Sequence, residues 1–481
     1  MNIISQFNQF LVKNFNDFLK KFFNTSNYWN KSSDINNYVS FMNGLDNFST
    51  SLNKNIIIAY FNYIDDEFFK SSYRKNFCES KGFYERKDLV TMFGPISFKR
   101  RYYYDKKTKE RFFFVDLFLG LKKRKRFDPI VCSEIVNKAT EYSYSKSGKL
   151  IAEKIGNKFN NYFNISRASA RNVVIDFDPI IEQHEESKRI ERLYVMLDEK
   201  FIASQFNNGD DHMIKAAVIF ENTQLEYKFK RNPDSMDRYR LVNSHVCASI
   251  TNNLLKDTVD FIYNTYDINY LKEIYFMGDC ATWITNFPRS CWFEFNQDTK
   301  VKFSMDNFHF TQALKLLTTN KEPNWYNSLY KLVLNNDKKM FKFACEQFIK
   351  LHPDRKETII SKMNYILNNW SYRQFYQSHQ FLKCSMESHI SHIFADLFSA
   401  RPKAYSKHGL EKLLTLRLLK VNGYDLKQVY LSSFNKINVQ HTSAVYNNIH
   451  NLNLDYHTNE SSFEKEYKTM FPFDTPNEIS V

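Results

Sequence analysis

The sequence predicts a helix-rich fold of mixed α/β class, and three observations support this prediction. The chain has 481 residues with 43% hydrophobic content, which is enough to bury substantial cores in more than one domain. Its 46 Phe and 30 Tyr exclude a mainly disordered chain, because disorder goes with few aromatic residues. Only 10 Gly and 10 Pro argue against collagen-like and turn-dense all-β folds.

Charge and cysteine usage narrow the class of protein further. Lys and Arg (67) exceed Asp and Glu (53), and this net charge of +14 favours a polyanionic partner such as nucleic acid. The 7 cysteines are scattered and never form a CxxC pair, which indicates a reducing compartment. No stretch approaches the roughly 20 apolar residues of a spanning helix, and residues 1–6 lack signal-peptide features. We therefore expect a cytoplasmic protein without membrane contact.

The N-terminal part divides into a helical region and a basic β-hairpin. Apolar residues at helical spacing predict helices within residues 1–84. β-rich runs at 89–94, 96–104 and 111–115 predict a hairpin module over residues 85–127. Basic residues with interleaved tyrosines are typical of nucleic-acid contacts, and a solvated basic face is the alternative. The candidate DNA-binding residues here are Lys99, Arg100, Arg101, Lys122, Lys123, Arg124, Lys125 and Arg126.

The next region, residues 128–189, has the pattern of a helix-turn-helix unit. Residues 143–159 predict its first helix, and Ser166 is placed to N-cap the second. Arg167 and Arg171 lie four residues apart, on one face of that second helix, where a recognition helix contacts DNA. An ordinary helical hairpin has the same pattern, so both interpretations stay open.

Strands and helices alternate over residues 190–311. Short apolar runs predict strands, and longer periodic segments after residues 250 and 280 predict helices, which gives the order β-β-β-α-β-α-β. The predicted strands cover residues 193–197, 214–220, 227–230 (the weakest), 274–277 and 301–305.

Acidic residues follow three of these strands. Asp198 and Asp279 come directly after apolar strands, and α/β folds assemble ligand sites at the carboxyl ends of parallel strands. Two adjacent carboxylates repel each other unless a divalent cation neutralises them, and Mg²⁺ prefers oxygen ligands. As the plainer alternative, such acids cap helices or form turns. Asp306 and His309 are open to the same two interpretations.

The remainder of the chain is mainly helical up to about residue 422, and the tail over residues 426–481 is rich in Asn, Ser and Glu. Between Cys384 and His392 there are many residues that bind zinc in other proteins. Their spacing matches no standard finger, so a structural zinc site is not expected.

Several strings together resemble the ISLre-type insertion-sequence transposases, which are grouped as an uncharacterised protein family, and the transposase-like proteins of integrative conjugative elements. The resemblance covers roughly residues 85–425, and the strings occur in the family's order. The strings are residues 91–103, 197–199, 278–284, 305–309, 387–392 and 399–406.

This resemblance implies a DDE-type recombinase, similar to the Mutator-like group, with an RNase H-like catalytic domain behind the basic hairpin and the HTH-like region. It places the catalytic, metal-binding acids at Asp198, Asp279 and Glu387, with Asp306 and His309 as supporting residues. The long separation of Asp279 and Glu387 implies a helical insertion over residues 312–380, before the Glu-bearing segment at 381–425.

The implied activity is two-metal phosphodiester transfer on double-stranded DNA, at the element's terminal inverted repeats and at a target. Two Mg²⁺ ions are expected, for which Mn²⁺ can substitute, and a homodimer would pair two element ends. Cys280 stands where this family often has Gly. A non-catalytic DNA-binding derivative and an RNase H-like nuclease with other substrates are the alternatives.

Overall fold

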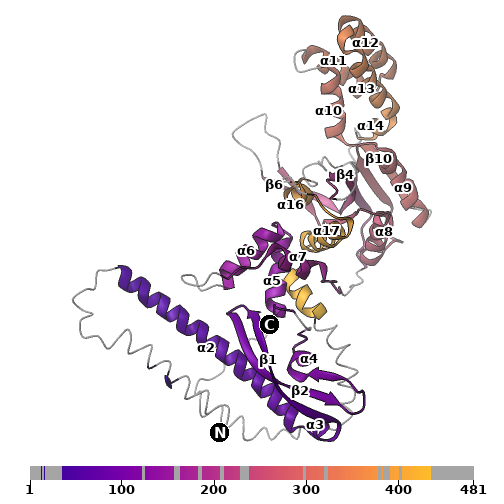
Figure 1. Ribbon diagram of the computed structural model, residues 1–481. Helices are drawn as coiled ribbons and strands as arrows, with labels where there is room; N and C mark the ends of the chain where they lie inside the picture. The colour runs from indigo at the N-terminus through magenta and orange to yellow at the C-terminus, as the bar shows by residue number, and fades with distance from the viewer. Residues whose placement is uncertain are drawn as a thin grey trace, which may run out of the picture. The chain divides into compact units, whose positions relative to one another are not determined.

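The protein is made of two compact units (Figure 1). The computed structural model describes residues 35–121, 125–155, 163–181, 187–205, 211–227, 238–295, 299–318, 323–376, 391–399 and 404–434, and also residues 12, 13, 16 and 382. One unit consists mainly of residues before Ile130, and the other runs from Ile130 to Ser433. Both contain helices and strands, which confirms the predicted helix-rich, mixed α/β class. No helix among the described residues is long and apolar enough to cross a membrane.

The first unit packs a long helix against a three-stranded antiparallel sheet with the order β1-β2-β3. Phe61 of the helix contacts Phe98 of the sheet, with ring centroids 4.8 Å apart. Strand β1 begins seven residues before the predicted module. The sequence did not indicate this earlier start, because residues 79–85 are mostly exposed and show no apolar alternation. The elements are α2 (Ile35–Lys70), α3 (Ser72–Phe77), β1 (Cys78–Thr91), β2 (Gly94–Asp105), β3 (Arg111–Phe113) and α4 (Phe114–Phe118).

The second unit opens with three helices, α5 (Pro129–Ala139), α6 (Tyr144–Ile155) and α7 (Arg167–Ile175). The predicted cap of α7 is confirmed, because Ser166 Oγ accepts a hydrogen bond of 3.1 Å from the Ser169 N–H. A Cβ on Gly148 of α6 would lie 2.5 Å from the Ile165 carbonyl oxygen. Glycine therefore lets α6 approach the segment that leads into α7.

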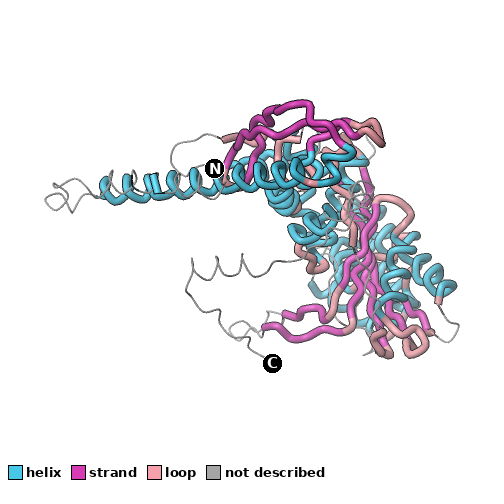
Figure 2. The backbone as a smooth tube through the Cα atoms, turned by 90° about the horizontal axis from the view of Figure 1, so that it is seen from below, coloured by secondary structure: helices cyan, strands magenta, loops and turns pink. Residues whose placement is uncertain are grey.

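A five-stranded sheet with the order β10-β9-β4-β5-β8 forms the centre of this unit. Strands β10, β9 and β4 are parallel, whereas β5 runs antiparallel to β4 and to β8. Figure 2 shows helices on both sides of these strands. The bounds are β4 (Arg192–Ile202), β5 (His212–Phe220), β8 (His245–Ser249), α8 (Leu254–Thr265), β9 (Glu273–Gly278), α9 (Thr282–Glu294) and β10 (Lys300–Met305).

The third strand of the sheet corrects the prediction for residues 227–230. Of these residues only Tyr227 is described, and it ends β6 (Asn222–Tyr227), which pairs with β7 (Arg238–Val242) in a separate two-stranded sheet. The sheet's third strand is β8, and its apolar run, Val246 to Ala248, is only three residues long. A run of this length gives too little alternation to be recognised in the sequence.

Both faces of the central sheet are buried, which explains the continuous apolar run in β4. On one face, Tyr194 and Met196 pack in a cluster with Leu413 of α17 (Lys407–Val421). On the other face, Val195 and Leu197 pack in a cluster with residues of α8 and α9. Each strand residue is therefore held in register by the hydrophobic effect from one side or the other.

Several helices follow the sheet. The first of them begins five residues before the predicted insertion, which was expected to start at residue 312. They share a core that includes Leu314, Phe341 and Ile366. Near the end of the unit, the Arg417 guanidinium donates to the carbonyl oxygens of Ile393 and Thr140. The remaining elements are α10 (Asn307–Thr318), α11 (Pro323–Leu334), α12 (Lys338–Leu351), a 3₁₀ turn (Pro353–Arg355), α13 (Lys356–Asn368), α14 (Trp370–Tyr376), a π-helical turn (Ser391–Ala395) and α16 (Asp396–Phe398).

We predict that His245 makes the stability of the second unit depend on pH. Its ring stacks on Phe261 with centroids 3.7 Å apart, and burial lowers its pKa from 6.5 to about 4. The folded state favours the neutral ring. The contribution of His245 to the free energy of unfolding is therefore complete above pH 6.5, and it is lost as the pH falls to 4. The loss is about 3 kcal/mol at most. Urea denaturation of the wild type and of His245→Gln between pH 4 and 7 measures it.

The His245→Gln variant should show a flatter acid limb than the wild type over this range. His408→Gln, which changes an exposed histidine of α17, is the matched control and should leave the wild-type slope unchanged. Equal slopes in all three proteins would contradict the assignment to His245.

Candidate active site

Two of the predicted catalytic acids come together at the end of the parallel strand pair. In the register of β4 with β9, Met196 lies opposite Met277. Two residues further along each strand path stand Asp198, still within β4, and Asp279, directly after β9. Because side chains alternate along a strand, both acids continue on the face of the two methionines.

Burial and charged neighbours both act on the Asp198 carboxyl. Burial raises the pKa of its carboxyl to about 6, and the negative charge of Asp279 adds to this rise. The Glu199 N–H, which donates to Asp198 Oδ1 over 2.7 Å, and the nearby His309 act in the opposite direction. Asp198, Asp279 and His309 therefore form one electrostatically coupled group.

Asp279 is held from two sides. Its Oδ1 accepts a hydrogen bond of 2.9 Å from the Ala281 N–H, at the start of α9. Its carbonyl oxygen accepts a hydrogen bond from the Tyr365 hydroxyl of α13. Helix α13, within the predicted helical insertion, thus contacts the backbone of Asp279, which the sequence did not indicate.

Asp306 is buried, 3% exposed, between β10 and α10. Its N–H donates to the Gly278 carbonyl oxygen over 2.8 Å, and its Oδ1 accepts from the Phe308 N–H over 3.4 Å. Asp306 therefore forms the turn into α10, which is the role that the alternative interpretation of the sequence gave it. It also lies close enough to Cys280 to raise the pKa of that thiol.

The motif that contains Asp279 depends on two unusual backbone positions. A Cβ on Gly278 would lie 2.5 Å from Ile284 Cγ2 and 3.0 Å from the Leu197 carbonyl oxygen, so glycine permits close packing beside β4. Cys280 has a φ of 68°, in the left-handed region that favours glycine. Burial raises the pKa of its thiol to about 12, so the thiol is protonated and poorly reactive at neutral pH.

A hydrogen bond joins the two acid-containing strings. The indole N–H of Trp283 in α9 donates to Glu199 Oε2, next to Asp198. The Lys215 ammonium lies over the Trp283 ring, 5.3 Å from its centroid, and Lys215 is the register partner of Glu199. Glu199 therefore acts within the fold, on the face opposite to Asp198, and fixes α9 against β4.

The third predicted acid, Glu387, lies outside the described residues, as do Cys384 and His389. Within the part of the chain that is described, no group of three or more His, Cys, Asp and Glu side chains is close enough to hold a metal ion. The described site thus contributes two carboxylates, and the prediction for Glu387 stays a prediction.

Comparison with known proteins places this site within a family. The profile of the Uncharacterised protein family (UPF0236) matches residues 40–433, which include every acid named above. The chain belongs to this family.

Related UPF0236 proteins occur in Caldanaerobacter subterraneus subsp. tengcongensis. Two of them are 27% identical over 365 residues, which cover 74% of this chain and 72% and 68% of theirs. A third is 28% identical over 366 residues, which cover 72% of its length. Its name carries eleven locus designations of that genome.

The predicted basic residues of this UPF0236 member fall into different environments. Arg100 is 7% exposed and forms an ion pair of 2.9 Å with Asp116. Arg101 pairs with Asp65 and Asp66, at 3.2 and 2.6 Å. Both arginines therefore contribute to the packing of the first unit. The exposed predicted cations are Lys99, Lys125, Arg126, Arg167 and Arg171, whereas Lys122, Lys123 and Arg124 lie outside the described residues.

We predict that Gly278→Ala destabilises the second unit by about 1–3 kcal/mol, the usual cost of overpacking. The new methyl group would collide with Ile284 Cγ2 and approach the Leu197 carbonyl oxygen, forcing β9 or α9 away from β4. The double variant Gly278→Ala with Ile284→Ala should cost less than the sum of the two single changes. Urea denaturation of the four proteins measures the coupling, and strict additivity would contradict the packing argument.

Proposed function

We propose that this protein is a DNA transposase of the DDE type, similar to the ISLre-type transposases, which cuts and joins DNA at the ends of a mobile element. The observation that carries the proposal is the adjacency of Asp198 and Asp279 at the end of the β4–β9 pair. Within the five-stranded sheet, the element order β-β-β-α-β-α-β is the one expected of an RNase H-like domain, which supports the same assignment.

The donor set suits Mg²⁺. Asp198 and Asp279 offer oxygen ligands, and a cation would offset both the burial and the neighbouring Asp279 charge that raise the pKa of Asp198. The resemblance supplies Glu387 as a third ligand. Bound Mg²⁺ would supply activation of an attacking oxygen and charge neutralisation at the leaving oxygen of a phosphodiester.

The surrounding residues keep the two acids in place. The Tyr365 hydroxyl and the Ala281 N–H fix Asp279, and the Glu199 N–H fixes Asp198. His309 brings an imidazole to the same group, from which it can donate a hydrogen bond to a DNA phosphate. Such preorganisation is what electrostatic catalysis of phosphoryl transfer requires.

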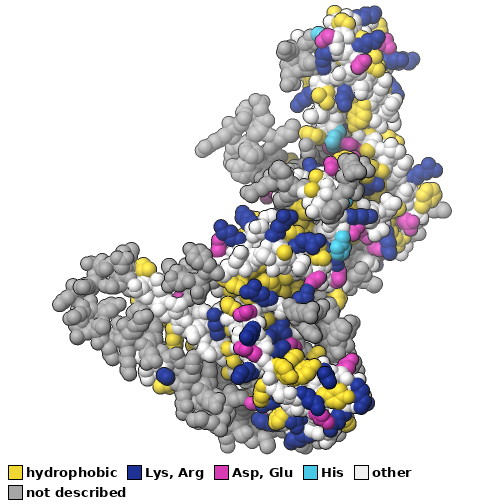
Figure 3. All heavy atoms as spheres, viewed as in Figure 1, with side chains coloured by type: hydrophobic (Ala, Val, Ile, Leu, Met, Phe, Trp, Pro, Cys, Tyr) yellow, Lys and Arg dark blue, Asp and Glu magenta, His cyan; other side chains and the backbone are white. Residues whose placement is uncertain are grey.

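Surfaces suited to DNA occur in each unit. In the first, a pocket of about 660 Å³ is lined by three Asp or Glu side chains, by the buried Arg86 and Arg100, which pair with Asp116, and by four exposed cations, Lys87, Arg111, Lys125 and Arg126. In the second, Lys and Arg side chains gather over α6 and α7 (Figure 3), where Lys146, Lys149, Arg167 and Arg171 are exposed. Exposed cations of this kind neutralise phosphates without reading sequence.

The relative with eleven locus designations adds an independent argument. One protein encoded at many places in a genome is what repeated copying of a mobile element produces. This supports transposition over the alternative of a nuclease that acts on other substrates.

We predict that the wild-type protein nicks DNA carrying the inverted repeats that flank its reading frame when Mg²⁺ is present. Asp279→Asn removes one charged ligand, so nicking should fall at least about a hundredfold. A gel assay with end-labelled DNA measures the rate. Asp260→Asn, which changes an exposed aspartate of α8, is the matched control and should retain wild-type nicking.

Three results would contradict the proposal. Equal nicking by the wild type and Asp279→Asn would exclude these acids as ligands. Cleavage of unrelated duplexes or RNA as fast as of element ends would indicate a general nuclease. DNA binding without any nicking would indicate a non-catalytic derivative.

A further inference from the structure

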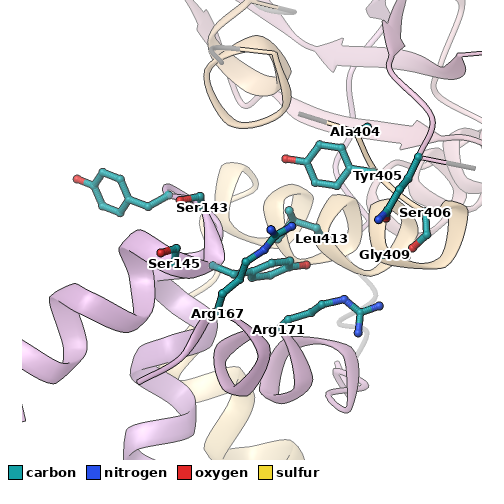
Figure 4. Close-up of a pocket in the computed structure, with 12 residues that line it drawn as sticks. Ser143, Ser145, Arg167, Arg171, Ala404, Tyr405, Ser406, Gly409 and Leu413 are labelled. Atoms are coloured by element: carbon teal, nitrogen blue, oxygen red, sulfur yellow. Dashed lines mark hydrogen bonds between the residues drawn. The ribbon is translucent and has the colours of Figure 1, made fainter. Parts of the chain in front are cut away.

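The second unit contains a pocket of about 400 Å³ (Figure 4), and neither of the paired acids lines it. Its walls come from the start of α6, from α7, from the segment after β4, and from the segment that leads into α17. Figure 4 shows Arg167 and Arg171 on one side of the pocket, and Tyr405, Ser406 and Leu413 on the other. The residues that carry the argument are Tyr144, Arg167, Arg171, Gln205, Tyr405 and Ser406.

Arg167 and Arg171 have no counterion in the part of the chain that the structure describes. Among the described residues, no carboxylate lies within ion-pair distance of Arg167 or Arg171, whereas Arg100, Arg101 and Arg192 all have one. Both guanidinium groups act electrostatically on the Tyr144 hydroxyl, so their charge reaches into the pocket. A pair of unneutralised guanidinium groups at a pocket favours an anionic ligand, above all a phosphate.

A buried polar group and a helix N-terminus also face the pocket. The Tyr144 hydroxyl is buried and has no hydrogen-bond partner within the described parts of the chain. Ser406 caps α17 by accepting the Gly409 N–H over 3.2 Å, so the positive end of that helix dipole adjoins the pocket. The aromatic rings of Tyr144 and Tyr405 provide apolar surface beside the charged wall.

The size and chemistry together select the ligand. A volume of about 400 Å³ is at the lower end of small-molecule sites and cannot admit a DNA duplex. Arginines suit a phosphate, and tyrosine rings suit a nucleobase, which stacks on them regardless of its identity. We propose that this pocket binds one unpaired nucleotide of a DNA strand, with its phosphate on Arg167 and Arg171 and its base against the tyrosines.

The position of the pocket fits a strand that also reaches the paired acids, so the inference rests on the proposed function. Gln205 lies seven residues after Asp198 along the path of β4, and its N–H donates to the Tyr405 carbonyl oxygen over 3.0 Å. At about 3.3–3.6 Å per residue, the pocket wall lies within about 25 Å of Asp198. A duplex strand carries a phosphate every 3.4 Å or so, hence the two sites are at most about seven nucleotides apart.

Fluorescence anisotropy on the full chain in EDTA tests the pocket without cleavage. The probes are a 20-base-pair duplex with a single-stranded tail of four thymidines, the same duplex with blunt ends, and one with a tail of four abasic sites. We expect the wild type to bind the thymidine-tailed duplex at least about tenfold more tightly than the other two, given the usual strength of base stacking.

The variant Arg167→Gln with Arg171→Gln should lose this preference and bind the thymidine-tailed and blunt duplexes with equal affinity. Lys338→Gln with Lys339→Gln removes the same charge from an exposed part of α12 and should keep the preference. Circular dichroism melting checks that the variants fold.

Absence of a tail preference in the wild type, or its survival in the arginine variant, would overturn the proposal. Equal affinity for the abasic tail would exclude base binding. Thymidine monophosphate that binds this pocket while the tailed duplex does not would indicate a free-nucleotide site instead. Nicking of element ends without a tail preference would overturn the pocket alone, whereas a tail preference without nicking in Mg²⁺ would overturn the proposed catalysis alone.

Discussion

The parallel pairing of β4 with β9 is the constraint on which the rest of the site depends. Asp198 and Asp279 are 81 positions apart in the sequence, and only this pairing brings them to the same edge of the sheet. The arrangement is costly without a cation, because burial and like charge both disfavour the ionised carboxyl of Asp198. A fold that keeps such a pair together has to secure both strands firmly.

The contacts around the pair do this from three directions. Gly278 allows β9 and α9 to pack closely against β4. The Trp283 indole ties α9 to Glu199, and the Tyr365 hydroxyl ties the helical insertion to Asp279. The motif around Asp279 is therefore as much a packing motif as a ligand motif, which accounts for its glycine and its tryptophan. The left-handed backbone at Cys280 likewise explains why glycine suits that position.

The sequence predicted those parts of the fold that are buried on both faces. The strands β4, β5 and β9 were recognised because such strands contain continuous apolar runs, and β10 was recognised because Val301, Phe303 and Met305 alternate with polar residues. The strand β8 was missed because its apolar run is too short, and the start of β1 was missed because its residues are exposed. The two failures have different causes, because β8 is buried but too short to show a pattern, whereas the start of β1 has no buried face to produce one.

In the candidate site, the positions of Asp198, Asp279 and His309 were predicted from the ends of strands. Contacts between residues far apart in the sequence were not predicted. Nothing in the spacing of Tyr365 shows that it contacts Asp279, because that contact depends on how the insertion packs. The sequence did indicate that Arg100 is buried. It lies two and four residues after the buried Phe98 and Ile96 in the same strand, and therefore on the same face of the sheet. Its charge suggested a nucleic-acid contact, whereas the pattern indicates the internal ion pair with Asp116.

The central claim is that Asp198 and Asp279 together bind a divalent cation. Crystals grown with Mn²⁺ and measured at its absorption edge test this most directly. The account predicts an anomalous peak within bonding distance of carboxylate oxygens from both aspartates, and its absence in crystals of Asp198→Asn. Saturating Mn²⁺ that leaves both carboxylates without a metal would contradict the account.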